Sequence, residues 1–136
     1  MITELNYTTM YGVSVQIPLL DTIIVIGGNS SSGKTFIKDT APEFYNDEKT
    51  ALIEVFDYKR TVDLSVMKAL RNRLIIIDNA DILLSENEDV SNFINTDTNN
   101  QYLLFMRDDN DVDFSVDNYA ELQETGKQLK AVYPFR

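Results

Sequence analysis

The residues with the clearest chemical potential form a short glycine- and serine-rich stretch, Gly28–Thr35, which reads Gly-Asn-Ser-Ser-Ser-Gly-Lys-Thr. Glycine lets a backbone turn its N–H groups toward an anion and approach it closely, because no side chain stands in the way. A lysine and a hydroxyl residue at the end of such a stretch suit phosphate oxygens and a magnesium ion, respectively. The spacing G-x-x-x-x-G-K-[ST] therefore predicts a loop that binds the phosphates of a nucleotide.

The predicted ligand-binding residues are the whole stretch and the residue that follows it. They are Gly28, Asn29, Ser30, Ser31, Ser32, Gly33, Lys34, Thr35 and Phe36. We expect Lys34 to reach the β- and γ-phosphates and Thr35 to coordinate Mg²⁺. The β-branched run at 22–26 predicts a buried strand before the loop, and residues 35–38 can open a helix behind it, whose positive end favours an anion. The alternative is a glycine- and serine-rich turn that matches the pattern by accident.

A second informative stretch is Leu74–Asp78, in which four large apolar residues precede an acid. This run predicts a strand that is buried on both faces and ends in a carboxylate at the edge of the sheet. A carboxylate there can accept a hydrogen bond from a water on Mg²⁺ or from Thr35. We therefore predict that Thr35 and Asp78 support a magnesium ion. The alternative is that Asp78 only ends a buried strand at a turn.

Composition narrows the class of protein. The 136 residues predict a single domain over 1–136. The balance of 12 basic and 22 acidic side chains gives a net charge of −10, which argues against binding to nucleic acid or anionic lipid. The chain has no cysteine and no histidine, which excludes disulfides, thiol nucleophiles and histidine-based zinc sites. It shows neither a membrane-spanning run nor a signal peptide, so we expect a cytoplasmic protein without a membrane partner.

The remaining segments alternate between strand-like and helix-like patterns. Strands are expected at 9–17, 22–27, 51–56, 74–78 and 102–106, and helices at 34–40, 63–72 and 86–95. The first helix is expected to end before Pro42, and the third to begin at a capping box formed by Ser85 and Glu88. Residues 119–133 favour a β-hairpin that turns at Gly126, with a single amphipathic helix as the alternative.

The order of these segments resembles that of the P-loop NTPases over roughly residues 20–107, and Leu74–Leu84 is especially similar to the Walker B region of the AAA+ ATPases. The resemblance implies an α/β, three-layer P-loop NTPase-like fold with a mostly parallel central sheet. An N-terminal strand and the C-terminal β-hairpin would be additions to it. The chain would then be a minimal AAA+-like core without the helical lid domain.

The resemblance also implies catalytic roles for Lys34, Asp78, Asn79 and Arg107. Family members often carry an acid directly after the Walker B aspartate to activate water, but here that position is Asn79, whose amide cannot take a proton. Asp81 is the nearest other acid, and a turn or cap residue is the favoured alternative for it. Arg107 would contact the γ-phosphate, with pairing to a neighbouring aspartate as the alternative.

These patterns favour a small intracellular protein that binds a nucleotide, with ATP and Mg²⁺ preferred over other NTPs. It would hydrolyse the nucleotide slowly or act as a nucleotide-dependent switch or accessory subunit, together with a protein partner or as a homo-oligomer. One alternative is a small-molecule kinase, whose lid would have to use Lys59, Arg60 or Arg107. The other is a non-catalytic interaction protein with a degenerate P-loop.

Overall fold

The structure, a computed structural model, describes residues 2–27, 31–47, 51–57, 63–106 and 118–136. In these ranges nine strands form one sheet, in the order β1-β2-β9-β8-β3-β7-β6-β5-β4. The strands are β1 (Glu4–Thr8), β2 (Ser14–Pro18), β3 (Ile23–Gly27), β4 (Asn46–Asp47), β5 (Ala51–Asp57), β6 (Arg73–Asp78), β7 (Gln101–Phe105), β8 (Tyr119–Thr125) and β9 (Gln128–Val132). The helices are α1 (Ser31–Phe44), α2 (Leu64–Ala69), α3 (Ala80–Glu86) and α4 (Glu88–Thr96).

The middle of the sheet consists of parallel strands. β3 pairs with β8 and with β7, β7 pairs with β6, and β6 pairs with β5, all in the parallel sense. β7 is buried at all five positions, and β6 at every position after Arg73. Strands covered on both faces need continuous apolar side chains, which explains the runs that predicted β3, β6 and β7.

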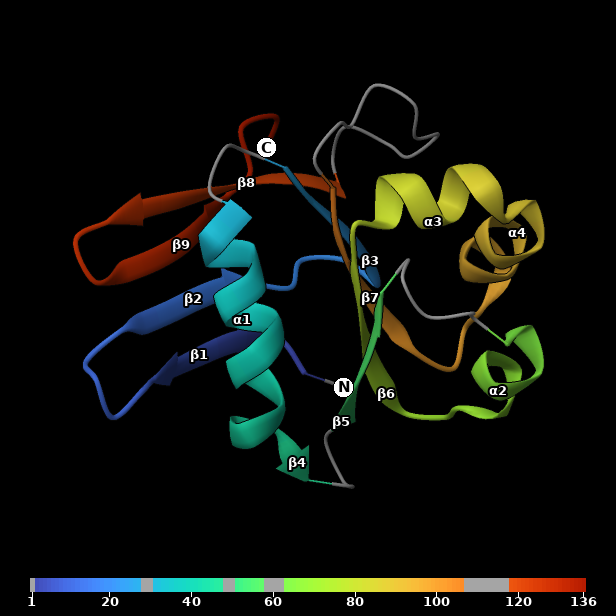
Figure 1. Ribbon diagram of the computed structural model, residues 1–136, viewed down its shortest axis with the longest axis horizontal. Coiled ribbons are helices and arrows are strands. Elements are labelled where there is room, and N and C mark those ends of the chain that lie inside the picture. The colour runs from blue at the N-terminus through green and yellow to red at the C-terminus, as the bar shows by residue number, and fades with distance from the viewer. Residues whose placement is uncertain (1, 28–30, 48–50, 58–62, 107–117) are drawn as a thin grey trace.

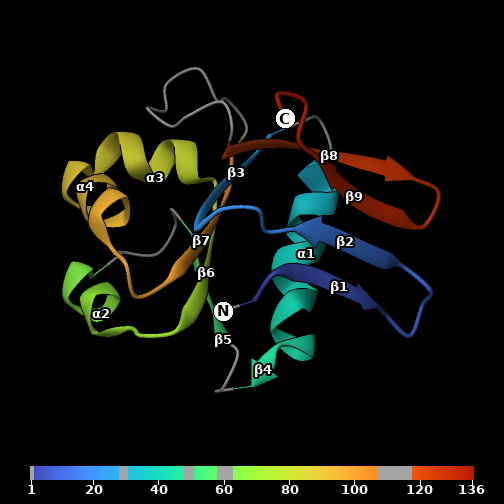
Figure 2. The same cartoon turned by 180° about the vertical axis from the view of Figure 1, so that it is seen from behind.

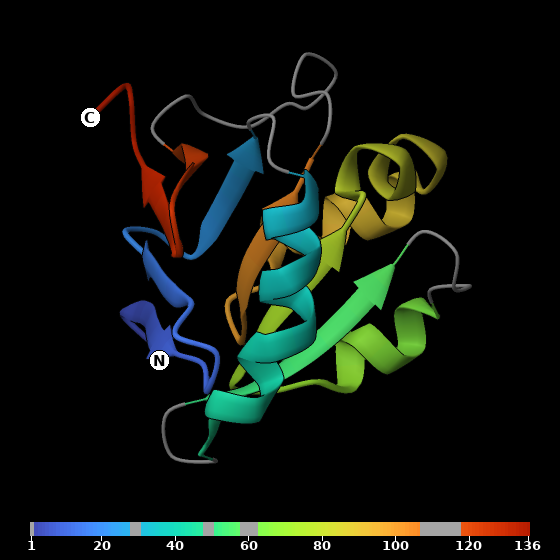
Figure 3. The same cartoon turned by 60° about the vertical axis from the view of Figure 1, so that its left-hand side comes forward.

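Helices cover both faces of these middle strands, as Figures 1 and 3 show. On one face Ile37 and Ala41 of α1 belong to a cluster that also contains Ile24 of β3. On the other face the buried side chains of α2, α3 and α4 pack on the opposite side of the same strands, with Val25 among them. No helix in the described ranges has the length and apolar character that crossing a membrane requires.

The predicted mostly parallel, three-layer P-loop NTPase-like fold is wrong. The sheet is mixed and curled, because β1 pairs antiparallel with β2, β4 with β5 and β8 with β9. Antiparallel pairs therefore form both edges of the sheet. The physical reason is that two hairpins enter the sheet without intervening helices, and a parallel pairing of β2 with β9 joins them. Figure 2 shows the two hairpins side by side.

The N-terminal strand predicted at 9–17 is confirmed only in its second half, where β2 lies, because residues 9–13 contain a turn. Gly12 has a φ of 79°, and its N–H donates to the Thr9 carbonyl across the turn that joins β1 and β2. Glycine adopts this left-handed conformation without the strain that a Cβ atom causes. The C-terminal hairpin is confirmed: β8 and β9 pair antiparallel, and Gly126 has a φ of 60° between them.

Several helix boundaries differ from the prediction, and at two of them the contacts show why. α1 continues through Pro42 to Phe44, because contacts with β1 hold its last turn: Tyr7 bonds to Thr40 and stacks on Phe44. The predicted capping box does not form, since Ser85 lies inside α3 and donates to the Ile82 carbonyl. Tertiary contacts therefore override the local signals at both places.

The outer edge of the sheet at β1 is covered by one side chain from the end of α1. The Asn6 backbone N–H donates to the Tyr45 hydroxyl at 2.6 Å, and this hydroxyl donates to the Asn6 carbonyl at 3.1 Å. One hydroxyl thus satisfies both outward-facing backbone groups of Asn6.

A polar cluster fixes the start of β7 at the opposite end of the strands from the glycine-rich stretch. Asp97, which follows α4, accepts hydrogen bonds from the Tyr102 hydroxyl, the Asn100 amide and the Asn99 backbone. Burial acts to raise the pKa of Asp97, but these hydrogen bonds outweigh it and the net pKa is lowered. Burial and the Asp97 carboxylate both raise the pKa of Tyr102, so its hydroxyl remains a donor.

The lowered pKa of Asp97 predicts a specific loss of stability in acid. A group with a depressed folded-state pKa stabilises the fold above its unfolded pKa of about 3.9 and loses that contribution as the pH falls through the folded value. We therefore expect wild type to have a higher melting temperature than Asp97→Asn at about pH 7. The difference between the two melting temperatures should shrink as the pH falls toward about 2. Thermal melts across this range measure it, with Glu4→Gln on exposed β1 as control. A difference independent of pH would contradict this role.

Candidate functional site

The strand that leads into the glycine-rich stretch ends where the sequence predicts it, but the start of the following helix differs. β3 ends at Gly27, at the carboxyl edge of the parallel strands, and α1 begins at Ser31. The helix therefore begins earlier than the predicted position 34. Gly28, Asn29 and Ser30 lie outside the described residues, as do the side chains of Ser31 and Ser32. The strand and the helix thus place the stretch between the carboxyl edge of the sheet and a helix N-terminus, whose backbone N–H groups favour an anion.

Lys34 is buried at this edge. Its side chain is in the first turn of α1, the residue is only 4% exposed, and its Nζ donates to the Met106 carbonyl at 2.8 Å. Met106 follows β7 and its own N–H donates to Ile26 of β3, so the ammonium lies at the carboxyl ends of two adjacent strands. A positive charge near a helix N-terminus opposes the helix dipole, and its burial adds a desolvation cost. An anion bound there would offset both costs.

The other described residues of the predicted binding set differ in their surroundings. Gly33 is buried, whereas Thr35 is exposed. Phe36 is half-buried and packs against the hydrophobic cluster beneath α1. Lys34 is therefore the member of this set whose charged group the structure places at the sheet edge.

Asp78 ends β6 and is 9% exposed. Its Oδ1 accepts from the Asn79 backbone N–H at 3.0 Å, and its Oδ2 from Lys38 Nζ at 3.2 Å. β7 lies between β3 and β6, so one strand separates the strand of Asp78 from the strand that leads into the glycine-rich stretch. The predicted metal-supporting carboxylate is therefore at the same sheet edge as Lys34.

Lys38 is a residue of this site that the sequence interpretation missed. It lies one helical turn after Lys34, and its Nζ is also 4.0 Å from Asp57 Oδ2 at the end of β5. Asp57 and Asp78 are register partners on adjacent strands, so Lys38 bridges two neighbouring carboxylates. A hollow of about 300 Å³ lies beside it, lined by Lys38, Asp39, Val55, Phe56 and Asp57. The four-residue spacing from Lys34 was the signal that could have identified it.

The residue after Asp78 adopts a left-handed backbone conformation. Asn79 has φ 52° and ψ 43° and occupies the N-cap position of α3 without a side-chain cap bond. Asparagine tolerates this conformation better than most residues. Asp81 is in the first turn of α3, where an acid is favoured by the helix dipole, rather than at the cap. Arg107, Lys59 and Arg60 lie outside the described residues.

Of the common metal ions, Asp78 and Thr35 suit Mg²⁺, which needs few protein ligands, better than an ion that requires a full set of protein ligands. Asp78 and Thr35 offer a carboxylate and a hydroxyl, which are hard oxygen donors. No group of three or more histidine, cysteine, aspartate or glutamate side chains that could hold a metal ion occurs in the described part of the chain. Mg²⁺ typically binds one or two carboxylates together with phosphates and water. The cation beside Asp78 Oδ2 in this structure is the Lys38 ammonium, which Mg²⁺ would have to displace.

Comparison with known proteins finds no matching protein family, curated protein or solved structure.

Removing the Lys38 charge leaves two neighbouring carboxylates without the cation that bridges them. Because the Lys38 and Asp78 side chains are only 19% and 13% exposed, we expect Lys38→Met to lower the free energy of unfolding by about 1–3 kcal/mol. Added Mg²⁺ should restore more stability to this variant than to wild type. Chemical denaturation with and without Mg²⁺ measures both effects.

Lys130→Met is the matched control, since Lys130 lies on an exposed position of β9. It should leave both the free energy of unfolding and the response to Mg²⁺ close to wild type. If Lys38→Met and Lys130→Met behaved alike, Lys38 would not be the counter-ion of Asp57 and Asp78.

Proposed function

We propose that this chain is a small P-loop protein that binds a nucleoside triphosphate, ATP in the first place, together with Mg²⁺. The observation that supports this most is the buried Lys34, which lies in the first turn of α1 directly after a glycine-rich stretch. An ammonium held beside a helix N-terminus and a glycine-rich stretch can contact a ligand of opposite charge, and the helix N–H groups add to this attraction. The polyphosphate chain of a nucleotide is such a ligand.

In this proposal each described residue has a simple task. Lys34 binds the β- and γ-phosphates, and the N–H groups at the start of α1 donate to phosphate oxygens. Thr35 and Asp78 hold the magnesium ion, which neutralises charge that develops on the phosphates. Lys38 leaves Asp78 when the ion binds and is then free to contact a phosphate oxygen. The exchange of Lys38 for Mg²⁺ would couple nucleotide binding to the ion pairs of Lys38 with Asp57 at the end of β5 and with Asp78 at the end of β6.

We expect hydrolysis to be slow. The residue next to Asp78 is Asn79, whose amide can orient a water molecule but cannot accept its proton. Its left-handed backbone also directs the chain away from β6 into α3. A binding protein with weak turnover suits a nucleotide-dependent switch or an accessory subunit. The cysteine-free composition is compatible with the cytoplasm, which we propose as its compartment.

Loss of the Lys34 charge should abolish nucleotide binding without unfolding the protein. Lys34→Met retains the apolar stem but leaves the Met106 carbonyl without this donor, so the free variant should still fold and should melt somewhat below the wild-type temperature. At about one hundred times Kd, Mg²⁺–ATP should raise the melting temperature of wild type by roughly 10 °C. It should leave that of Lys34→Met unchanged.

Lys130→Met serves again as control and should keep the full nucleotide response. If wild type showed no shift with any nucleotide, with or without Mg²⁺, nucleotide binding would be refuted. The non-catalytic interaction protein would then be the remaining interpretation.

The account of slow hydrolysis predicts that a carboxylate at position 79 raises turnover. Asn79→Asp is the variant of choice, because aspartate also tolerates the left-handed backbone that glutamate would strain. Since a general base contributes at least about 100-fold in favourable geometry, we expect a rise of about tenfold or more in phosphate release. An unchanged rate would contradict this account. Release that required an added hydroxyl compound would instead favour a kinase, with its acceptor in the hollow beside Lys38.

A further inference from the structure

We infer that Tyr119 and Phe135 form the subsite on which the aromatic base of the nucleotide stacks. This inference rests on the proposed nucleotide binding and adds a second contact region outside the glycine-rich stretch. Tyr119 packs against Gly27 at the end of β3, and Phe135 packs on Tyr119, at a place where the phosphate chemistry gives neither ring a task.

Tyr119 contacts the residue that immediately precedes the glycine-rich stretch. β8 runs parallel to β3, and Tyr119 is in register with Val25, two residues before Gly27. A Cβ atom at position 27 would lie 2.7 Å from the Tyr119 hydroxyl oxygen and 2.8 Å from Cε2, which is closer than side chains approach. A side chain at position 27 would therefore force the Tyr119 ring to move. This contact places an aromatic group at the end of the strand that leads into the glycine-rich stretch.

Phe135 extends this aromatic surface toward solvent. Its ring centroid is 6.1 Å from that of Tyr119, with the planes inclined by 46°, within the range of favourable aromatic pairs. Phe135 is nevertheless 60% exposed, which leaves much of its ring accessible. An aromatic ring that is both packed on one neighbour and open to solvent can accept a flat, apolar ligand.

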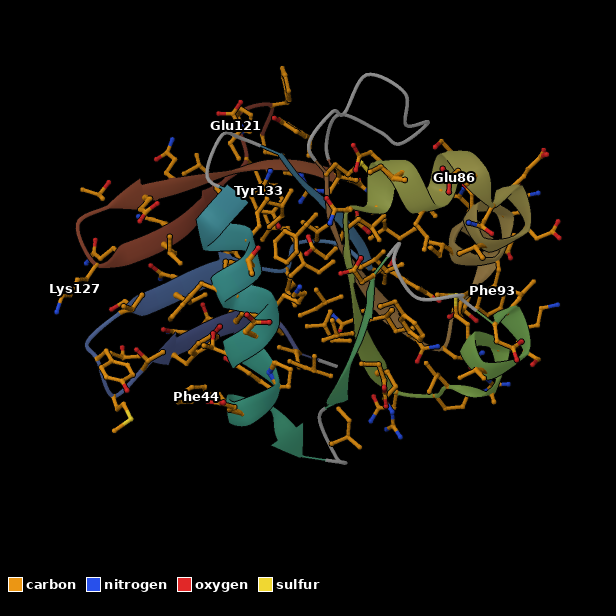
Figure 4. The ribbon with its side chains drawn as sticks, viewed as in Figure 1. Phe44, Glu86, Phe93, Glu121, Lys127 and Tyr133 are labelled. Carbon is orange, nitrogen blue, oxygen red and sulfur yellow. The ribbon has the colours of Figure 1, made fainter. Side chains whose placement is uncertain are left out.

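The backbone around Phe135 is held on both sides. The Tyr133 hydroxyl donates to the Pro18 carbonyl, and the Arg136 guanidinium lies 3.4 Å from Asp21 Oδ2. The Arg136 backbone N–H also donates to the Tyr133 carbonyl. Figure 4 labels Tyr133, which follows β9 and begins this segment, and Glu121 on β8. Because these contacts already order the segment, binding a base there requires little further ordering.

The position suits the covalent structure of a nucleotide. The ribose and the α-phosphate separate the base from the β- and γ-phosphates, so a base subsite must lie beside the phosphate-binding stretch and not within it. The rings next to Gly27 meet this condition at the strand end of the stretch, whereas Lys34 lies at its helix end. Stacking uses the π-face that every base has, so this contact predicts little preference between ATP and GTP.

The test compares a nucleotide with the same phosphate chain lacking a base. Isothermal titration calorimetry with Mg²⁺–ATP and with Mg²⁺–tripolyphosphate gives a Kd for each probe. We expect Phe135→Ala to weaken ATP and GTP by about tenfold and to leave tripolyphosphate unchanged. Lys34→Met should weaken all three. Phe44→Ala is the matched control, since Phe44 is 43% exposed and lies at the other end of α1.

A second variant tests the contact between the base and position 135 directly, because it keeps an aromatic ring at that position. The chain has no tryptophan, so Phe135→Trp introduces a single tryptophan at the subsite. Its emission should be quenched by Mg²⁺–ATP and not by Mg²⁺–tripolyphosphate, and its affinity for ATP should equal or exceed that of wild type.

The outcomes separate the two proposals. If wild type bound neither probe, the proposed function and this inference would both fail. If both probes bound to wild type, but Phe135→Ala weakened them equally or not at all, the base subsite alone would be refuted. Selective loss of ATP and GTP, together with selective quenching in Phe135→Trp, would establish it.

Discussion

Lys34 and Lys38 lie one turn apart on α1, and each carries its ammonium to the carboxyl end of a different strand. Lys34 donates to the carbonyl that follows β7, and Lys38 bonds to Asp78 at the end of β6. Since β6 and β7 are adjacent, the two contacts fix the first half of the helix over the sheet edge. The place of the glycine-rich stretch relative to Asp78 depends on this attachment, because the stretch joins β3 to the same helix.

The attachment carries a cost that the apolar core must offset. Lys34 lies in the first turn of α1, where its charge opposes the helix dipole, and it is almost completely buried. Ile37 and Ala41, on the same helix, are fully buried against the sheet and supply favourable apolar contact in return. The bond from Lys34 to the Met106 carbonyl gives the buried ammonium an acceptor at the sheet edge.

The interior strands could be predicted because a strand covered on both faces needs an unbroken apolar run, and β3, β6 and β7 have one. The mixed sheet could not. Gly12 interrupts the first run and was a usable sign of a turn, but no local pattern signals the pairing of Ser14 with Gln128, from opposite ends of the chain. The candidate site likewise has residues that the sequence could identify and one that it could not. Motif spacing identified Lys34 and Asp78, whereas the bridge from Lys38 exists only because β5 and β6 place two carboxylates in register.

The hydroxyl of Tyr45 has a consequence for how copies of this protein meet. An open sheet ends in a row of backbone donors and acceptors, to which a second chain can add a strand. At Asn6 both outward-facing groups are already bonded to one phenol, held in place by the end of α1. A strand approaching β1 would have to displace Tyr45, which directly follows α1 and whose N–H donates to the Ala41 carbonyl. The helix that carries Lys34 and Lys38 therefore also positions the side chain that protects this sheet edge against aggregation.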